Sequence, residues 1–96
     1  MLVLITYDVN TETPDGKKRL RQVAKACQDY GQRVQHSVFE CEADSALMVK
    51  IKDRLIRIIN VEKDSLRFYF IGNNCHDKIE HYGAKEPFDV TGSLIV

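Results

Sequence analysis

The sequence lacks the features that mark several classes of protein. It has three cysteines (Cys27, Cys41 and Cys75), which cannot all pair with one another, and none of them forms a C-x-x-C motif. Its longest uncharged apolar run, Met1 to Ile5, is far shorter than the ~20 residues that span a bilayer, and no secretory leader pattern is visible. We therefore expect a reduced cytoplasmic protein without a disulfide framework, a cysteine zinc site or a membrane segment.

Several catalytic signatures are also missing. The sequence contains no glycine-rich phosphate loop and no nucleophile elbow, and its histidines form neither H-x-x-x-H nor H-E-x-x-H. His36 lies within a predicted strand, whereas His76 and His81 fall in a polar region, so we expect structural or surface roles for all three. Cys27 and Cys41 are expected to be small core residues.

The chain has no net charge either, with 14 basic and 14 acidic residues among 96. Its charges are nevertheless segregated. Residues 1–16 hold three acids and no base, whereas residues 17–33 hold six bases and one acid. The six bases are Lys17, Lys18, Arg19, Arg21, Lys25 and Arg33. A locally basic surface can attract phosphate groups even when the total charge is zero.

A strand and a helix are predicted in the first third of the chain. The continuous apolar run over residues 2–7 is typical of a strand covered on both faces and central in its sheet, and Asp8 ends it. Residues 10–16 are turn formers. Helical spacing of apolar residues begins after Lys17, and Gly31 is expected to end the helix in a left-handed cap position. The apolar face of this helix consists of Leu20, Val23, Ala24 and Cys27.

Alternation and a second helix follow. Residues 33–42 alternate with period two, which predicts either one long bent strand or two short strands that break near residues 36–37. Asp44 or Ser45 is the expected N-cap of an amphipathic helix. The apolar residues of this second helix are Met48, Ile51, Leu55, Ile58 and Ile59.

Two more strands are predicted, over residues 66–71 and 79–82. The aromatic residues of the first raise the alternative of an RNA-recognition motif, but the glycines of that motif are absent. Phe68 and Phe70 are more simply one side of a packed strand, with Tyr69 on the other.

This order of elements predicts one α+β domain over residues 1–96, of the ferredoxin-like β-α-β-β-α-β class with both helices on one face of an antiparallel sheet. Residues 1–83 would form its core, and the apolar segment 84–96 is expected to dock on another surface. The other face of the sheet must also be covered, and so short a chain has no third layer to cover it. We therefore expect a homodimer packed sheet against sheet.

Asp8 is the most distinctive single residue, because an acid at the end of a buried strand lies at the rim of the sheet. It is either a turn or cap aspartate or a metal ligand. One carboxylate per chain is too few for firm Mg²⁺ binding, but a two-fold dimer would supply a second Asp8 facing the first.

The basic cluster of residues 17–21 opens the first predicted helix. It is either a solvated helix face or a binding site for an anion. Cations at a helix N-terminus oppose the helix dipole, and a nucleic-acid phosphate over the first turn would satisfy them together with the free N–H groups.

Four strings in the chain resemble a known family. They are ITYDV at residues 5–9, KRLRQVAK at residues 18–25, YGQRVQHSVFE at residues 30–40 and DSLRFY at residues 64–69. The chain is similar here to the small CRISPR-associated nuclease that accompanies the CRISPR integrase in adaptation modules. The likeness covers nearly the whole chain, in order and at matching spacing.

This resemblance implies a symmetric homodimer whose C-terminal strand pairs with the partner's sheet. It also implies a Mg²⁺-dependent phosphodiesterase, with Mn²⁺ as a substitute, in which Asp8 binds the metal at the dimer interface. Members of the family act on single-stranded RNA or double-stranded DNA, and their dimer bridges integrase subunits during spacer acquisition. Tyr7, Arg33, Ser37 and Phe39 lie at positions that resemble the family's site-associated residues.

In the implied mechanism Asp8 from both chains holds Mg²⁺, while Arg33 and the pair Arg19 and Arg21 position the nucleic-acid backbone, with Lys17 and Lys18 beside them. Two alternatives remain: a non-catalytic nucleic-acid-binding scaffold of the integrase complex, and a stand-alone toxin ribonuclease of the virulence-associated protein D type. The sequence leaves open whether RNA or DNA is the substrate and which of the two helix arginines contacts phosphate.

Overall fold

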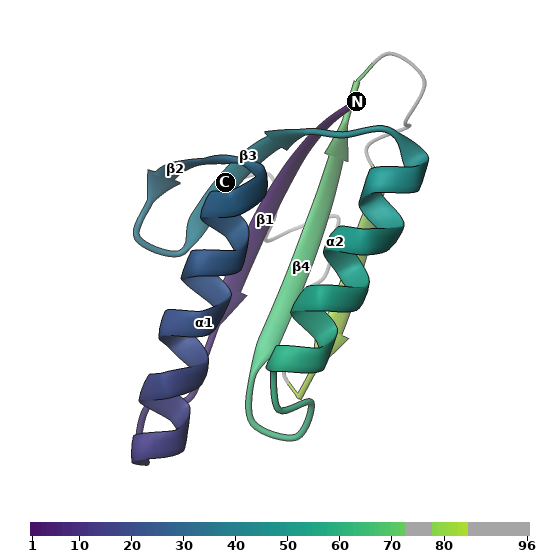
Figure 1. Cartoon of the computed structure of the whole chain (residues 1–96). Coiled ribbons are helices and arrows are strands. Elements are labelled where there is room, and N and C mark those ends of the chain that lie inside the picture. The colour runs from purple at the N-terminus through teal and green to yellow at the C-terminus, as the bar shows by residue number, and fades with distance from the viewer. Residues whose placement is uncertain (73–77, 85–96) are drawn as a thin grey trace.

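The computed structural model describes residues 1–72 and 78–84. Its elements are β1 (Leu2–Asp8), α1 (Pro14–Tyr30), β2 (Gln32–Gln35), β3 (Val38–Glu42), α2 (Ser45–Ile58), β4 (Ser65–Ile71) and β5 (Ile79–Gly83) (Figure 1). The predicted order of strands and helices is confirmed, and the short strand predicted over residues 79–82 is β5. The predictions for Cys75, His76 and the segment beyond Ala84 lie outside the described residues.

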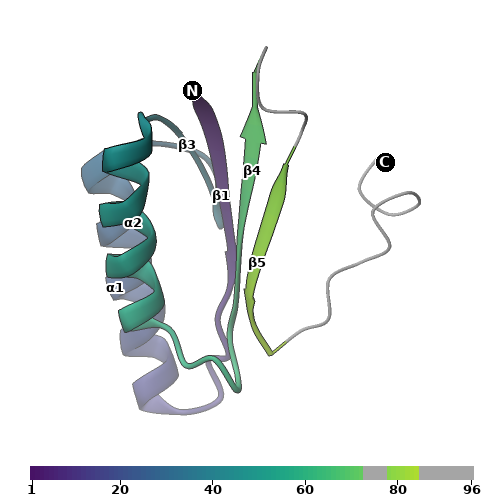
Figure 2. The same cartoon turned by 90° about the vertical axis from the view of Figure 1, so that its right-hand side faces the viewer.

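All the strands form one antiparallel sheet in the order β2-β3-β1-β4-β5. The first strand is central, as predicted from its apolar run. Both helices cover the same face of this sheet (Figure 2). The predicted α+β class is therefore confirmed.

Within residues 1–72 and 78–84, helices cover strand β1 on one face only (Figure 2). Its buried residues, which lie beneath the helices, are Val3, Ile5 and Tyr7, and its half-buried residues are Leu2, Leu4 and Thr6. Among the described residues, the second face of β1 carries half-buried side chains and no helix, so the prediction of a strand covered on both faces is not met there. The reason is that both helices pack on one side, so that alternate residues of β1 point to a face without a helix (Figure 2).

Helix α1 begins earlier than predicted, at Pro14. The Thr13 side chain accepts a hydrogen bond from the backbone N–H of Gly16 at 3.2 Å, which makes Thr13 the N-cap, and proline suits the first helical position because it needs no partner for an N–H. The acidic residue of the first turn is Asp15. The basic cluster consequently follows the helix start and does not open it.

Gly31 ends α1, but not in the predicted left-handed conformation. Its φ is −150°, which is extended, and its N–H donates to the carbonyl of Cys27 at 2.9 Å. The need for glycine comes from space, because a Cβ at this position would lie 2.3 Å from the backbone oxygen of Glu40 on β3. The chain turns from helix to strand through this close approach.

The alternating segment forms two strands with a break at residues 36–37, which resolves the two alternatives of the sequence. The register of β2 against β3 shifts between Arg33 and Gln35. The turn packs against the centre of the sheet, because the N–H of Tyr7 donates to the carbonyl of Ser37 at 3.2 Å.

The core lies between the sheet and the two helices. Asp44 caps α2 by accepting from the N–H of Leu47 at 2.8 Å. The largest fully buried side chains include Phe39, Phe68, Ile5, Ile51 and Leu55. Cys27 and Cys41 are buried and free, as predicted. The alternation predicted for β4 is confirmed, since Phe68 and Phe70 are buried on one side and Tyr69 is half-buried on the other.

No helix in the described ranges is both long enough and apolar enough to cross a membrane.

Candidate functional site

Asp8 lies at the end of β1, exposed, on the sheet face that carries no helix. It lines a cavity of about 670 Å³ together with side chains from α1 and from the β2–β3 turn. Among the other lining residues are Tyr7, Arg21, Arg33, His36 and Ser37. The structure thus brings together one carboxylate and two guanidinium groups that are far apart in the sequence.

Tyr7 holds the β2–β3 turn beside Asp8. Its hydroxyl donates to the carbonyl of His36 at 3.2 Å, and its backbone N–H donates to that of Ser37 at the same distance. Burial raises the pKa of the Tyr7 hydroxyl above its usual value, so this group remains a protonated donor at neutral pH. Tyr7 therefore fixes the wall of the cavity that carries His36 and Ser37.

Phe39 lies beneath Arg33 and does not line the cavity. The Phe39 side chain is fully buried, and the guanidinium carbon of Arg33 lies 5.1 Å from the centre of its ring. The rings of Tyr7 and Phe39 stack with their centres 6.1 Å apart. A fully buried ring cannot touch a ligand, so any contribution of Phe39 to the site comes through its support of Arg33.

The structure separates the two arginines of α1. Successive helical residues are about 100° apart, so side chains two residues apart point in opposite directions. Arg21 lines the cavity, whereas Arg19 is turned to Asp64, with Nε 2.8 Å from Oδ2 and Nη2 3.3 Å from Oδ1. Lys17 and Lys18 are exposed on α1 and do not line the cavity.

Asp64 is a residue of the site that the sequence did not reveal, since it stood out only as part of the string DSLRFY. Its side chain is fully buried and accepts hydrogen bonds from the backbone N–H groups of Asn10 at 3.0 Å and Asn60 at 2.8 Å, in addition to those from Arg19. Burial alone would raise the pKa of Asp64, but the Arg19 guanidinium and the two N–H donors outweigh it and lower the pKa. No local pattern indicates this role, because the side-chain partner lies 45 residues away.

The described residues of one chain do not form a complete metal site. Among residues 1–72 and 78–84, no group of three or more histidine, cysteine, aspartate or glutamate side chains could hold a metal ion. The Asp8 carboxylate is a hard oxygen donor of the kind that Mg²⁺ prefers, and it faces an open cavity. The donor chemistry fits Mg²⁺, but the described part of the chain supplies no second carboxylate beside Asp8 in this cavity.

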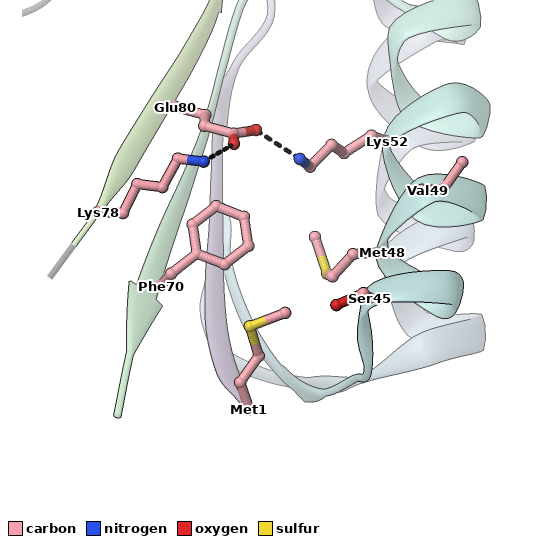
Figure 3. A pocket seen from close by; sticks show the side chains of 8 residues that line it. All are labelled: Met1, Ser45, Met48, Val49, Lys52, Phe70, Lys78 and Glu80. Atoms are coloured by element: carbon pink, nitrogen blue, oxygen red, sulfur yellow. Dashed lines mark ion pairs between the residues drawn. The ribbon is translucent and has the colours of Figure 1, made fainter. Parts of the chain in front are cut away.

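A second cavity, of about 420 Å³, lies at the end of the sheet where β1 begins (Figure 3). Met1, Met48, Val49 and Phe70 give it apolar walls. Its one carboxylate is Glu80, which lies 2.6 Å from Nζ of Lys52 and 3.0 Å from Nζ of Lys78. Because both oxygens of Glu80 already pair with ammonium groups, this cavity is not a candidate metal site.

The fold and the Asp8 cavity together define a class of protein. It is a small α+β domain with one carboxylate and two guanidinium groups at a single rim of the sheet, an arrangement suited to a phosphate-bearing ligand.

Comparisons with known proteins identify the family. The model of the family described as CRISPR associated protein Cas2 matches residues 1–79. The chain is 59% identical over 96 residues to the "CRISPR-associated endoribonuclease Cas2" of Chlorobaculum tepidum, with all of both chains covered. It is also 59% identical over 95 residues to the "CRISPR-associated endonuclease Cas2" of Halalkalibacterium halodurans, covering 99% of each chain.

A solved structure agrees with these relatives. The crystal structure of Streptococcus pyogenes Cas2 at pH 6.5 matches with a TM-score of 0.70 and 63% identity, covering 79% of this chain and 92% of that one. The chain belongs to the Cas2 family of CRISPR-associated proteins, as its resemblance predicted.

Proposed function

We propose that this protein is a Mg²⁺-dependent endonuclease of CRISPR adaptation, cytoplasmic and active as a homodimer. The observation that carries the proposal is the cavity at the end of β1, where Asp8 lies beside Arg21 and Arg33. The printed names of its relatives, which describe an endoribonuclease and an endonuclease, agree with it.

The homodimer is supported by the sheet face that carries no helix. This face presents half-buried apolar side chains, namely Leu2, Leu4, Val38, Tyr69 and Ile79. Asp8 follows the same alternation along β1, so it lies on this face too. Two copies packed through it about a two-fold axis would bury the apolar residues and bring two Asp8 carboxylates to one interface.

The fold class supports the same assembly. We propose that the domain is ferredoxin-like, because its first six elements have the β-α-β-β-α-β order of that class. We also propose that residues 84–96 dock on the partner protomer, which would extend the contact between the two copies.

Asp8 from each copy would hold Mg²⁺, which when bound supplies Lewis-acid polarisation of a phosphate and a water of lowered pKa. Arg21 and Arg33 would bind phosphate oxygens from two walls of the cavity, since guanidinium groups match phosphate geometry. The Ser37 hydroxyl offers a further hydrogen bond in the same cavity. Contacts of this kind are to the backbone of the nucleic acid, so weak sequence preference is expected.

The test is Asp8→Ala, with Asp53→Ala as the control because Asp53 is an acid on the exposed side of α2. Cleavage of single-stranded RNA and of double-stranded DNA is measured with Mg²⁺ and with Mn²⁺. We expect Asp8→Ala to abolish cleavage and Asp53→Ala to leave it intact. Unchanged cleavage by Asp8→Ala would remove this residue from the mechanism.

A second function, that of a nucleic-acid-binding scaffold for the CRISPR integrase, is favoured by the exposed basic residues of α1. These are Lys17, Lys18, Arg21 and Lys25, and they can bind a phosphate backbone whether or not Asp8 is intact. Spacer acquisition with the integrase present separates the two functions. Loss of cleavage with normal acquisition in Asp8→Ala would show that the scaffold function suffices.

A further inference from the structure

The two arginines at the start of α1 face different surroundings. Arg21 is exposed and lines the Asp8 cavity. The Arg19 side chain is only 15% exposed, and it makes a two-pronged contact with the carboxylate of Asp64. Arg19 is not among the residues that line the Asp8 cavity.

Arg19 is mostly buried beside Asp64 and does not line the Asp8 cavity, so it could reach a phosphate bound in that cavity only by leaving Asp64. The Asp64 carboxylate is fully buried, and without Arg19 its charge would be balanced by two backbone N–H groups alone. Removal of one partner from a buried ion pair is strongly unfavourable, because the remaining charge stays out of water. The pair is therefore a permanent part of the fold.

The same carboxylate also fixes the chain that follows Asp8. Asp64 Oδ1 accepts from the N–H of Asn10, two residues beyond the end of β1, and its Oδ2 accepts from Asn60 and from Arg19 Nε. Val9, between Asp8 and Asn10, is buried in the core. The two residues after β1 are thus held in place, Val9 by burial of its side chain and Asn10 by the hydrogen bond of its backbone N–H.

We infer that Arg19 is a positioning residue of the Asp8 site and not a ligand of nucleic-acid phosphates: through Asp64 it fixes the turn after β1, and it leaves phosphate binding on α1 to Arg21. The inference rests on the proposed function, because it divides roles within that site. It answers a question that the sequence leaves open, namely which of Arg19 and Arg21 contacts phosphate.

The first measurement separates phosphate contact from positioning. Binding to double-stranded DNA is followed without divalent metal between about 50 and 200 mM salt, where the logarithm of the binding constant falls by about 0.9 per phosphate contact for each unit of log salt. Arg21→Gln is expected to reduce the slope by about 0.9 for each phosphate that the variant no longer neutralises. Arg19→Gln is expected to leave the slope unchanged, like the control Arg57→Gln, which removes a guanidinium paired with Asp53 on α2.

The second measurement tests the positioning role without cleavage. Mn²⁺ binding to the DNA-free protein is titrated through the electron paramagnetic resonance signal of the free ion. Loss of a residue that orients a metal ligand typically weakens metal binding by about 10-fold or more, and we expect this of Arg19→Gln but not of Arg57→Gln. If Arg19→Gln does not fold, the double variant Arg19→Gln with Asp64→Asn replaces it, because it leaves no uncompensated buried charge.

The outcomes are distinct. A slope reduced in the Arg19 variant as much as in Arg21→Gln overturns the inference, and so does unchanged Mn²⁺ binding. An unchanged slope with weakened Mn²⁺ binding supports it. Absence of DNA binding in the wild-type protein would instead contradict the proposed function, and absence of Mn²⁺ binding would contradict its metal site.

Discussion

Replacement of Asp64 by alanine tests whether the buried carboxylate holds the fold together. In the structure it accepts from the N–H groups of Asn10 and Asn60 at 3.0 and 2.8 Å and pairs with Arg19. A buried N–H donor left without an acceptor costs about 1–3 kcal/mol, so these two part-buried donors together predict a loss of at most about 2–6 kcal/mol. A domain of 96 residues has a free energy of unfolding of about 5–14 kcal/mol, so this loss is a large part of the total.

The assay is urea unfolding followed by circular dichroism at one fixed protein concentration, since dimerisation would make stability depend on concentration. With a slope of about 2 kcal/mol per molar urea, the midpoint should fall by about 1–3 M. Asp53→Ala is the matched control, because it removes an exposed ion pair within α2 that is worth about 0.3–0.5 kcal/mol. If Asp64→Ala lowered the midpoint no more than this control, the assignment of Asp64 as an anchor would be wrong.

Three further predictions follow from particular contacts. The pKa of Asp64 is lower in the folded than in the unfolded protein, so its contribution to stability is present above about pH 4 and is lost as pH falls through the folded pKa. When unfolding is measured between about pH 2 and 7, Asp64→Asn should therefore lose less stability on acidification than the wild-type protein. Gly31→Ala should lower stability by about 1–3 kcal/mol in thermal or urea unfolding, since its Cβ would lie 2.3 Å from the Glu40 oxygen, and a wild-type midpoint would contradict that geometry. Arg33→Lys should weaken DNA binding about 2–5-fold, because it removes the stacking of the guanidinium on the Phe39 ring, which is worth about 0.5–1 kcal/mol. The dependence of the binding constant on salt should stay the same because the charge is kept, and a changed salt dependence would contradict this explanation.

The helices and strands can be predicted from the local spacing of apolar residues. Apolar spacing places both helices and the central strand, because a helix or strand that buries one face repeats its apolar residues with its own period. The residues at which the first helix begins and ends are harder to predict from the sequence. The helix start at Pro14 depends on the Thr13 side chain, and the need for Gly31 depends on Glu40 of a neighbouring strand, which no local pattern contains.

The fold class, the family and the position of Asp8 at a strand end can all be predicted without a structure, because each depends on residues that are close along the chain. The roles of the arginines cannot, because they depend on how distant segments pack. The tertiary structure sets Arg33 on a buried ring and Arg21 in the Asp8 cavity, and it turns Arg19 to a carboxylate 45 residues away. The physical reason is that charge and helical spacing are local properties, whereas the partner of a buried charge is fixed by the packing of distant segments.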